Sequence, residues 1–189
     1  LKRPLKTSQV LLKEKKVLKS LLIENKEGIN MNDKSSNPVA IITGGSRGVG
    51  AATARLLASK GWNITITCTS SMEDAESVVK ECEALGVEAL ALSADVSDDA
   101  ACKKTSEDTI EKWGRIDALV NNAGTTKFVF NHGDLEGLDA EDFLHIYKVN
   151  VVGPFQMVRA CKEMLLKSDN PNVINISSIA GIKGIGSCL

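Results

Sequence analysis

The segment Val39–Gly50, VAIITGGSRGVG, constrains the fold of this chain more than any other. Its first four residues are apolar, which is typical of a strand buried on both faces in a parallel sheet. Glycines follow at 44, 45, 48 and 50, where a tight turn needs unusual torsions and the backbone must approach a ligand closely. A helix is expected from Ala51 to Lys60, and its N-terminal dipole would favour an anion at the turn. The segment therefore predicts a site for the pyrophosphate of a dinucleotide.

Length and composition limit the number of domains and the kinds of partner. With 189 residues, 43% of them hydrophobic, the chain can bury one substantial core. Its formal net charge of −1 argues against a nucleic-acid surface, and no apolar run approaches the roughly eighteen residues of a membrane span. Five cysteines without a C-x-x-C pair predict free thiols in a reducing compartment, and no metal-ligand spacing is present. We therefore expect a cytoplasmic protein without nucleic-acid, membrane or metal partners.

The N-terminal segment differs from the rest in charge. Residues 1–30 hold eight Lys or Arg against three Glu. Leu11, Leu18, Leu21 and Leu22 would share one face of a helix, so a basic targeting or membrane-surface segment is one interpretation. The interpretation that we favour is a disordered leader, or sequence translated upstream of a start at Met31. We accordingly divide the chain into a basic, disordered leader (1–37) and a dinucleotide-binding domain (38–189).

Strand and helix patterns alternate through the predicted domain. After the first strand and helix, further strands are expected at 63–68, 87–92, 117–120 and 173–177, and further helices at 72–85, 98–113 and 140–168. A polar loop is expected at 125–138. Strands separated by helices require right-handed crossovers and a parallel sheet. The sequence therefore predicts an α/β fold of three layers (α/β/α), a doubly wound parallel sheet of the Rossmann type, incomplete at the C-terminus.

Ligands of such sheets bind outside the carboxyl ends of the strands. The second strand is followed by Cys68-Thr69-Ser70, with no acid before Glu73. Sites that prefer NAD usually place Asp or Glu here to hold the ribose 2′-OH. Arg47 is available to a 2′-phosphate, although it could instead be a solvated turn residue. We therefore favour NADP as the cofactor and keep NAD as possible.

The remaining strand ends also hold polar or small residues. Asp95 could accept from the adenine amine or cap the next helix. The segment Asn121-Asn122-Ala123-Gly124 offers amides that would pin neighbouring loops, then small residues where a flat ring needs room. A hydroxyl of Ser177-Ser178 would face the position of a nicotinamide.

Five motifs in this order resemble the short-chain dehydrogenase/reductase family over about 38–189, and in general the 3-oxoacyl-[acyl-carrier-protein] reductase type. They are TGGSRGVG (43–50), Asp95-Val96, NNAG (121–124), Asn150 in KVN, and ISSIAG (176–181). The resemblance implies hydride transfer between a nicotinamide and a carbonyl or secondary alcohol. It implies that Ser178 hydrogen-bonds the substrate oxygen, and that Asn150 fixes the helix and a water of the proton relay. Together with the strand-end positions it places these residues at the cofactor: Gly44, Gly45, Ser46, Arg47, Gly48, Val49, Gly50, Thr69, Asp95, Val96, Asn122, Ala123 and Gly124.

In that family a tyrosine donates the proton, and a lysine four residues later lowers the tyrosine pKa and holds the ribose. The spacing from Ser178 would put this pair near 191 and 195, beyond Leu189. Tyr147 is followed by Val151 and is expected to pack or cap a surface. We therefore expect a fragment, inactive as given, with an apolar sheet face and an open edge. The whole protein is expected to be a homo-oligomer, a dimer or a tetramer. Related folds pair through the helix expected at 140–168, whose apolar residues could serve either the core or a partner.

Several alternatives stay open at this point. A non-catalytic dinucleotide-binding module, redox-sensing or scaffolding, would share the same pocket, but pure binding needs neither Ser178 nor Asn150. His132 is expected to be a solvated loop residue and His145 a surface residue of the helix. Phe128 and Phe130 suggest an apolar wall on the substrate side.

Overall fold

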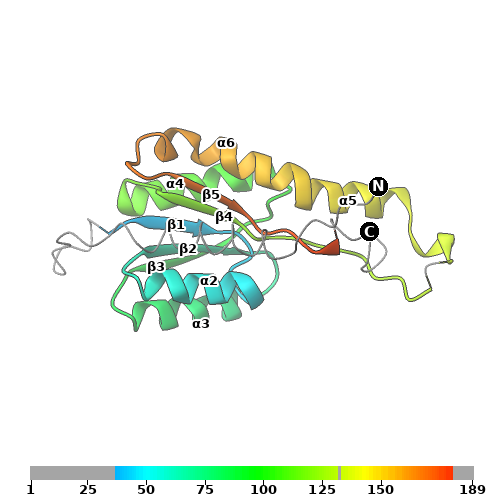
Figure 1. Cartoon of the computed structure of the whole chain (residues 1–189), viewed down its shortest axis with the longest axis horizontal. Coiled ribbons are helices and arrows are strands. Elements are labelled where there is room, and N and C mark those ends of the chain that lie inside the picture. The colour runs from blue at the N-terminus through cyan, green and yellow to red at the C-terminus, as the bar shows by residue number, and fades with distance from the viewer. Residues whose placement is uncertain (1–36, 132, 181–189) are drawn as a thin grey trace, which may run out of the picture. The chain divides into compact units, whose positions relative to one another are not determined.

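The computed structural model describes residues 37–131 and 133–180. The predicted leader lies outside this range except for its last residue, as do His132 and Cys188. Five parallel strands pair in the order β3-β2-β1-β4-β5 (Figure 1). Their bounds are β1 Val39–Ile42, β2 Asn63–Cys68, β3 Ala89–Ser93, β4 Ala118–Asn121 and β5 Asn172–Asn175.

Helices cover both faces of this sheet. The α-helices are α2 Gly48–Ala58, α3 Met72–Glu83, α4 Asp99–Trp113, α5 Ala140–Tyr147 and α6 Gly153–Leu165. One face is covered by α2 and α3 and the other by α4 and α6 (Figure 1). The predicted three-layer, doubly wound Rossmann fold is confirmed.

Alternate residues of the central strands fill two separate cores. Ala40 and Ile42 of β1 pack toward α2 and α3, where Trp62 is also buried. Ile41, on the opposite face, packs with Leu119 against α4 and α6. This period of two is what a strand covered on both faces requires, and each fully buried aliphatic side chain stabilises the fold by about 1.5–3 kcal/mol.

The described cysteines pack as small apolar residues. Cys68, Cys82, Cys102 and Cys161 are free and buried. Burial raises the pKa of the Cys161 thiol to about 12, so it is neutral at physiological pH. These thiols therefore stabilise the core by packing rather than acting as nucleophiles.

The long helix expected over 140–168 is interrupted. Between α5 and α6 lies a π-helical turn, η3 (Lys148–Val152), and the N–H of Gly153 donates to the carbonyl of Lys148. Pro154 follows and has no N–H for the i→i−4 bond to the carbonyl of Asn150, which explains why α-helical pairing is lost here. The apolar pattern continues through this turn, so the sequence did not reveal it. Smaller differences lie at strand ends: β3 begins two residues later than expected, and β5 ends two residues earlier.

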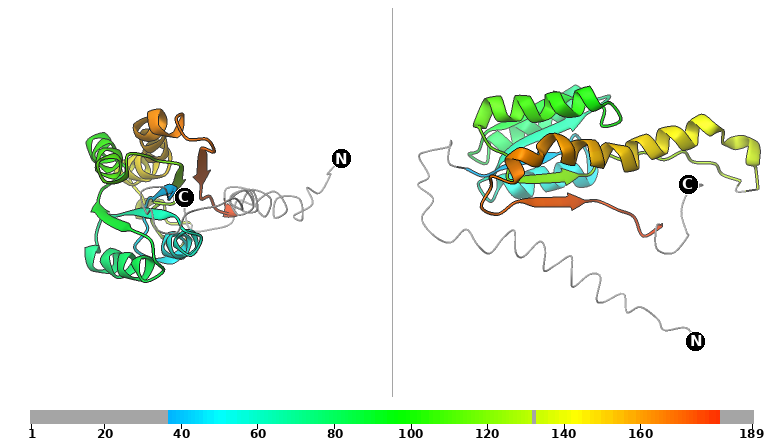
Figure 2. Two further views of the ribbon diagram at one scale, coloured as in Figure 1. Left: turned by 90° about the vertical axis from the view of Figure 1, so that its left-hand side faces the viewer. Right: turned by 90° about the horizontal axis from the view of Figure 1, so that it is seen from above.

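The segment before α6 leaves the sheet. The loop 125–138, with the short 3₁₀ turn η2 (Leu135–Gly137), and α5 extend beyond the carboxyl ends of the strands (Figure 2). Phe128 and Phe130 lie edge-to-face in this loop with ring centroids 4.7 Å apart, and Phe130 is 93% exposed. At the sheet edge, Val173 of β5 is 45% exposed.

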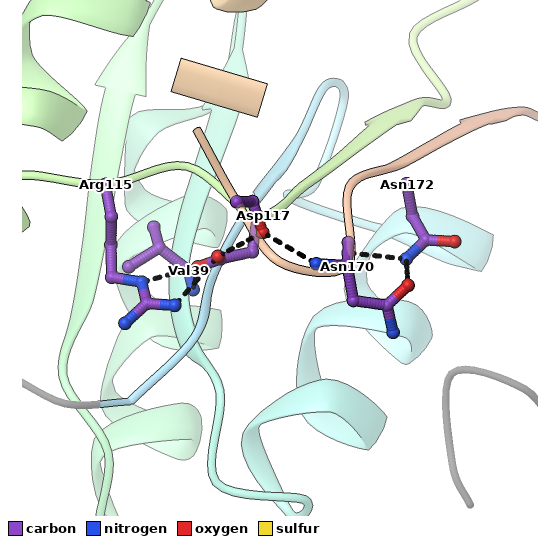
Figure 3. Close-up of polar contacts among 6 residues, drawn as sticks. Val39, Arg115, Asp117, Asn170 and Asn172 are labelled. Carbon is purple, nitrogen blue, oxygen red and sulfur yellow. Dashed lines mark hydrogen bonds and ion pairs between the residues drawn. The ribbon is translucent and has the colours of Figure 1, made fainter. Parts of the chain in front are cut away.

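At the amino ends of the strands, the buried carboxylate of Asp117 joins several segments (Figure 3). Asp117, 4% exposed, accepts from the backbone N–H of Val39 at 2.8 Å and from Arg115 Nε at 2.8 Å and Nη2 at 2.9 Å. The hydroxyl of Ser168 donates to it at 2.7 Å. Burial alone would raise the pKa of Asp117, but these donors together hold it below its ordinary value. One side chain thus joins β1, β4 and the connection from α6 to β5.

No helix within 37–131 and 133–180 is long and apolar enough to cross a membrane.

Candidate functional site

The turn after β1 packs closely against its neighbours at the glycines 44 and 50. Gly44 has φ of +64°, a left-handed conformation that favours glycine. A Cβ on Gly44 would lie 3.0 Å from Ala123 Cα, and one on Gly50 would lie 2.4 Å from the carbonyl oxygen of Gly44. The turn therefore packs against both the start of α2 and the loop after β4.

The ends of the two neighbouring strands, β2 and β4, hold this turn. The N–H of Gly44 donates to Thr67 Oγ1 at 3.3 Å, and the N–H of Gly45 donates to the Thr67 carbonyl at 2.8 Å. From the other side, Asn122 Nδ2 donates to the carbonyls of Thr43 and Gly44, each at 2.9 Å. The glycine turn is thus fixed to the ends of both β2 and β4.

Thr43 is a central residue of the site that the sequence reasoning missed. Its Oγ1 accepts the backbone N–H groups of Asn122 and Ala123, both at 3.0 Å, and donates to the Val120 carbonyl at 3.4 Å. The side chain is 1% exposed. A threonine directly after a fully apolar strand was the available signal, since a buried hydroxyl needs partners.

The N-terminus of α2 is open to an anion. It has no side-chain cap and no acidic residue in its first turn, and Arg47 is the residue that precedes it. Three described helices differ: Asp98 caps α4, Asp139 forms a capping box on α5, and acids occupy the first turn of α3. The first turn of α6 also lacks a cap and an acid, but α6 continues directly from η3 and has no free N-terminus. The unpaired N–H groups and the dipole of α2 therefore remain available to a phosphate.

These elements surround a pocket of about 380 Å³ at the carboxyl ends of the strands. Its lining joins the ends of β1, β2, β3 and β4 with α5 and η3: Gly44, Ser46, Arg47, Thr67, Cys68, Thr69, Ser70, Ala94, Asp95, Val96, Asn122, Ala123, Gly124, Thr125, His145 and Val149.

Most of the expected cofactor residues line this pocket, but four of them do not. Gly45, Gly48, Val49 and Gly50 are absent from the lining. Thr67, Thr125, His145 and Val149 line the pocket without having been expected there. His145 was expected on the surface; its side chain is exposed, yet it lies on the pocket rim. It comes from α5, which approaches the strand ends only in the folded chain.

The charges of the lining are few. Arg47 and Asp95 carry them, and the β2 end contributes only Thr67, Cys68, Thr69 and Ser70. Burial raises the pKa of the Cys68 thiol, so it is neutral there. Asp95 does not cap α4, which was the alternative expectation. Its Oδ1 accepts the N–H of Ser97 at 2.8 Å, within its own loop.

Asn150 acts on the pocket through Thr125. From η3, its Oδ1 accepts the N–H of Thr125 at 2.9 Å, and its Nδ2 donates to the Thr125 carbonyl at 2.8 Å. Asn150 itself is not part of the lining. Its amide fixes a loop residue that is.

Residues 176–180, which follow β5 in the described part of the chain, do not line the pocket. Ser178 is exposed, and its Oγ accepts the N–H of Ala180 at 3.1 Å. Tyr147 is 58% exposed on α5 and does not line the pocket either. Between β4 and β5, Asn121 Nδ2 donates to Asn175 Oδ1 at 2.9 Å.

Comparisons with known proteins agree with this geometry. A family model described as short chain dehydrogenase matches residues 38–188. A 3-oxoacyl-[acyl-carrier-protein] reductase of Synechocystis sp. is 37% identical over 146 residues, which are 77% of this chain and 58% of that protein. The chain thus spans less than two thirds of the curated relatives that it matches.

Solved structures agree as well. A metagenomic short-chain oxidoreductase in complex with NADP is 33% identical, with a TM-score of 0.72 over 82% of this chain and 68% of that one. An NAD⁺-bound xylitol dehydrogenase is 28% identical, with a TM-score of 0.72 over 80% and 56%. This chain belongs to the short-chain dehydrogenase family and resembles its 3-oxoacyl-[acyl-carrier-protein] reductases.

Proposed function

We propose that residues 38–189 form the dinucleotide-binding part of an NAD(P)-dependent oxidoreductase that acts on a carbonyl or secondary alcohol. The observation that carries this proposal is the open N-terminus of α2 above a turn in which Gly44 and Gly50 leave no room for a Cβ. Backbone N–H groups and a helix dipole at one point suit a pyrophosphate.

NADP is the favoured cofactor. Arg47 lines the pocket beside a β2 end that offers no carboxylate. A guanidinium can bind a 2′-phosphate through charge-assisted hydrogen bonds, whereas a ribose 2′-OH would lack its usual acidic acceptor. NAD is the second candidate.

The other residues have separate tasks in this proposal. Small residues at Ala123 and Gly124 leave space for a flat ring, and Asn150 holds Thr125 at the same end of the pocket. When bound, the nicotinamide cofactor supplies or accepts a hydride. Ser178 would hydrogen-bond the substrate oxygen, which requires its segment to approach the pocket.

The cofactor proposal is tested by calorimetric titration of the 189-residue polypeptide with NADPH and NADH. We expect tighter binding of NADPH, and we expect Arg47→Ala to weaken NADPH by about ten- to a hundredfold, since a hydrogen bond to a charged group contributes about 1.5–3 kcal/mol. NADH binding should change little. Absence of binding by either nucleotide would overturn the proposal.

A non-catalytic dinucleotide-binding module is the second candidate function. It is favoured by the position of Ser178 outside the pocket lining. We expect the 189-residue polypeptide to bind NADPH without oxidising it when a ketone is added. The coding sequence past Leu189 decides between the candidates: a tyrosine near 191 with a lysine four residues later predicts turnover by the longer protein.

We also propose that the whole protein is a cytoplasmic homo-oligomer. Phe143, Tyr147, Val151 and Phe155 follow one another at intervals of four along α5, η3 and α6, and each is about half exposed or more. Such a stripe can pack against its own copy about a two-fold axis. Light scattering after size exclusion checks the stoichiometry, and Phe155→Glu should shift it toward monomer.

A further inference from the structure

The loop 94–98 after β3 contributes three neighbouring residues to the pocket lining, Ala94, Asp95 and Val96. Backbone bonds join its start to the end of β2 and close a turn at its end. Ala94 N–H donates to the Cys68 carbonyl at 2.9 Å, and Asp98 N–H donates to the Asp95 carbonyl at 3.0 Å. The centre of the loop, at Val96, is held by other elements.

Val96 is fixed by donors from two helices. Gln156 Nε2 of α6 donates to the Val96 carbonyl at 2.7 Å, and Cys102 Sγ of α4 lies 3.3 Å from the same oxygen. Gln156 is 8% exposed and Val96 4%. A buried amide that donates to a buried carbonyl is costly to remove, because both groups have already left water.

Gly153 brings α6 close enough for this bond. A Cβ at Gly153 would lie 2.7 Å from Val96 Cγ2 and 3.2 Å from its carbonyl oxygen. Gly153 and Gln156 are three residues apart, so they share one face of α6. The register of that face is set by η3, whose π-helical bond ends at Gly153.

We propose that Gln156 and Gly153 are positioning residues for the adenosine half of the cofactor pocket, acting through Val96. This inference rests on the dinucleotide site proposed above. Neither residue lines the pocket, so their effect on binding is indirect. Without the Gln156 donor the Val96 carbonyl would turn to find another partner, and Asp95 would move with it.

The adenosine half is identified by strand order. In a doubly wound sheet the residue that reads the ribose of the adenosine follows the second strand, and β2 and β3 lie on one side of β1. The loop after β3 therefore serves the adenosine half. Gly124 and Thr125, after β4, serve the nicotinamide half.

The test compares two fragments of the cofactor on the 189-residue chain. Adenosine 2′,5′-bisphosphate probes one half and reduced nicotinamide mononucleotide the other, with NADPH as the intact ligand. We expect Gln156→Met, which keeps the shape of the side chain and loses the donor, to weaken the adenosine fragment about tenfold. Affinity for the nicotinamide fragment should stay within twofold.

Ser106→Ala is the matched control. Ser106 Oγ of α4 donates to the Ala160 carbonyl of α6 at 2.9 Å, so this is another buried bond made with α6, and it lies away from the pocket. We expect this variant to lower the melting temperature and to leave both fragment affinities unchanged. A purely structural role for Gln156 would give the same pattern as Ser106→Ala.

Gly153→Ala tests the same route from the other residue of the pair. The new methyl group would lie 2.7 Å from Val96 Cγ2, and this overpacking is expected to lower the melting temperature because it outweighs the gain in helix propensity. We expect the adenosine fragment to weaken at least fivefold while affinity for the nicotinamide fragment stays within twofold. This variant also decides the question if Gln156→Met fails to fold.

The outcomes are distinct. Wild-type affinity for the adenosine fragment in both variants would overturn the inference and leave the dinucleotide site in place. Equal weakening of both fragments would also overturn it, since positioning of one half predicts a selective loss. If the wild-type chain bound neither NADPH nor the fragments, the proposed function itself would fall.

Discussion

Among single residues, Thr43 connects the two loops of the site with one hydroxyl group. Two backbone N–H groups, of Asn122 and Ala123, depend on its Oγ1. Both residues line the pocket. Thr43 itself does not line the pocket, but its side chain fixes the backbone of two residues that do.

Thr43→Val keeps the shape of this side chain and removes the acceptor. Each buried polar group left without a partner costs about 1–3 kcal/mol, so we expect the free energy of unfolding to fall by about 2–4 kcal/mol. NADPH affinity should fall as well. Urea denaturation measures the first effect and calorimetry the second.

Thr43→Ser is the matched variant, because it loses a methyl group and keeps the hydroxyl. We expect it to retain most of the stability and affinity. Equal losses in the two variants would show that packing of the methyl group, rather than the hydrogen bonds, is what Thr43 contributes.

Among the helices and loops, η3 shows how an irregular turn can serve the site. It exposes the Asn150 amide to both backbone groups of Thr125, in the loop after β4. Regular α-helical pairing ends here, where Pro154 removes a donor. The pocket is thus linked to α6 by a turn that differs from its neighbours in hydrogen bonding.

We expect Asn150→Ala to release the start of the loop 125–138. The N–H of Thr125 would lose its acceptor and exchange its hydrogen at least tenfold faster, which amide exchange followed by mass spectrometry or NMR can measure. Asn150→Asp keeps the acceptor and loses the donor, so protection of the Thr125 N–H should largely persist. Unchanged exchange in Asn150→Ala would contradict this role.

The sequence predicted regular elements better than contacts between them. β1 and β2 were predicted with their observed bounds, because glycine and polar residues interrupt the apolar runs on either side. The turn η3 was missed because its apolar pattern resembles that of a continuous helix. His145 and Val149 were missed as pocket residues because they come from α5 and η3, and reasoning from the strand ends alone does not include these elements.

For the molecule as a whole, the two ends of the sheet have different tasks. The carboxyl ends hold the pocket, and at the other end the Asp117 carboxylate joins three segments. Because Asp117 lies far from the pocket, a change at Asp117 is expected to alter stability far more than binding.

Asp117→Asn should lower the free energy of unfolding by about 2–3 kcal/mol at pH 7, because the bonds that Asp117 accepts are charge-assisted. The folded pKa of Asp117 is depressed, so its contribution is present above the unfolded pKa of about 3.9 and is lost as pH falls through the folded value. The difference between wild type and variant should accordingly shrink below about pH 4. Urea denaturation across pH 3–7 measures it.

Glu81→Gln provides the control. Glu81 also has a depressed pKa, through its hydrogen bond with Arg55, but this pair is exposed to solvent. We expect a much smaller change than for Asp117→Asn. If Asp117→Asn were as stable as the wild type at pH 7, the hydrogen bonds to the Asp117 carboxylate would add nothing to the stability of the fold.

The strand order also determines when the protein can complete its sheet during synthesis. Ala40 pairs with Ile64, 24 residues later, and with Ala118, 78 residues later. A ribosome needs about 3–11 s to make the intervening 54 residues at 5–20 residues per second. During that interval the nascent chain can pair β1 with β2, and can add β3 once residue 93 has been made, yet one edge of β1 stays bare and open to pairing with other chains. A chaperone that covers the bare edge of β1 would therefore matter most before β4 has been synthesised.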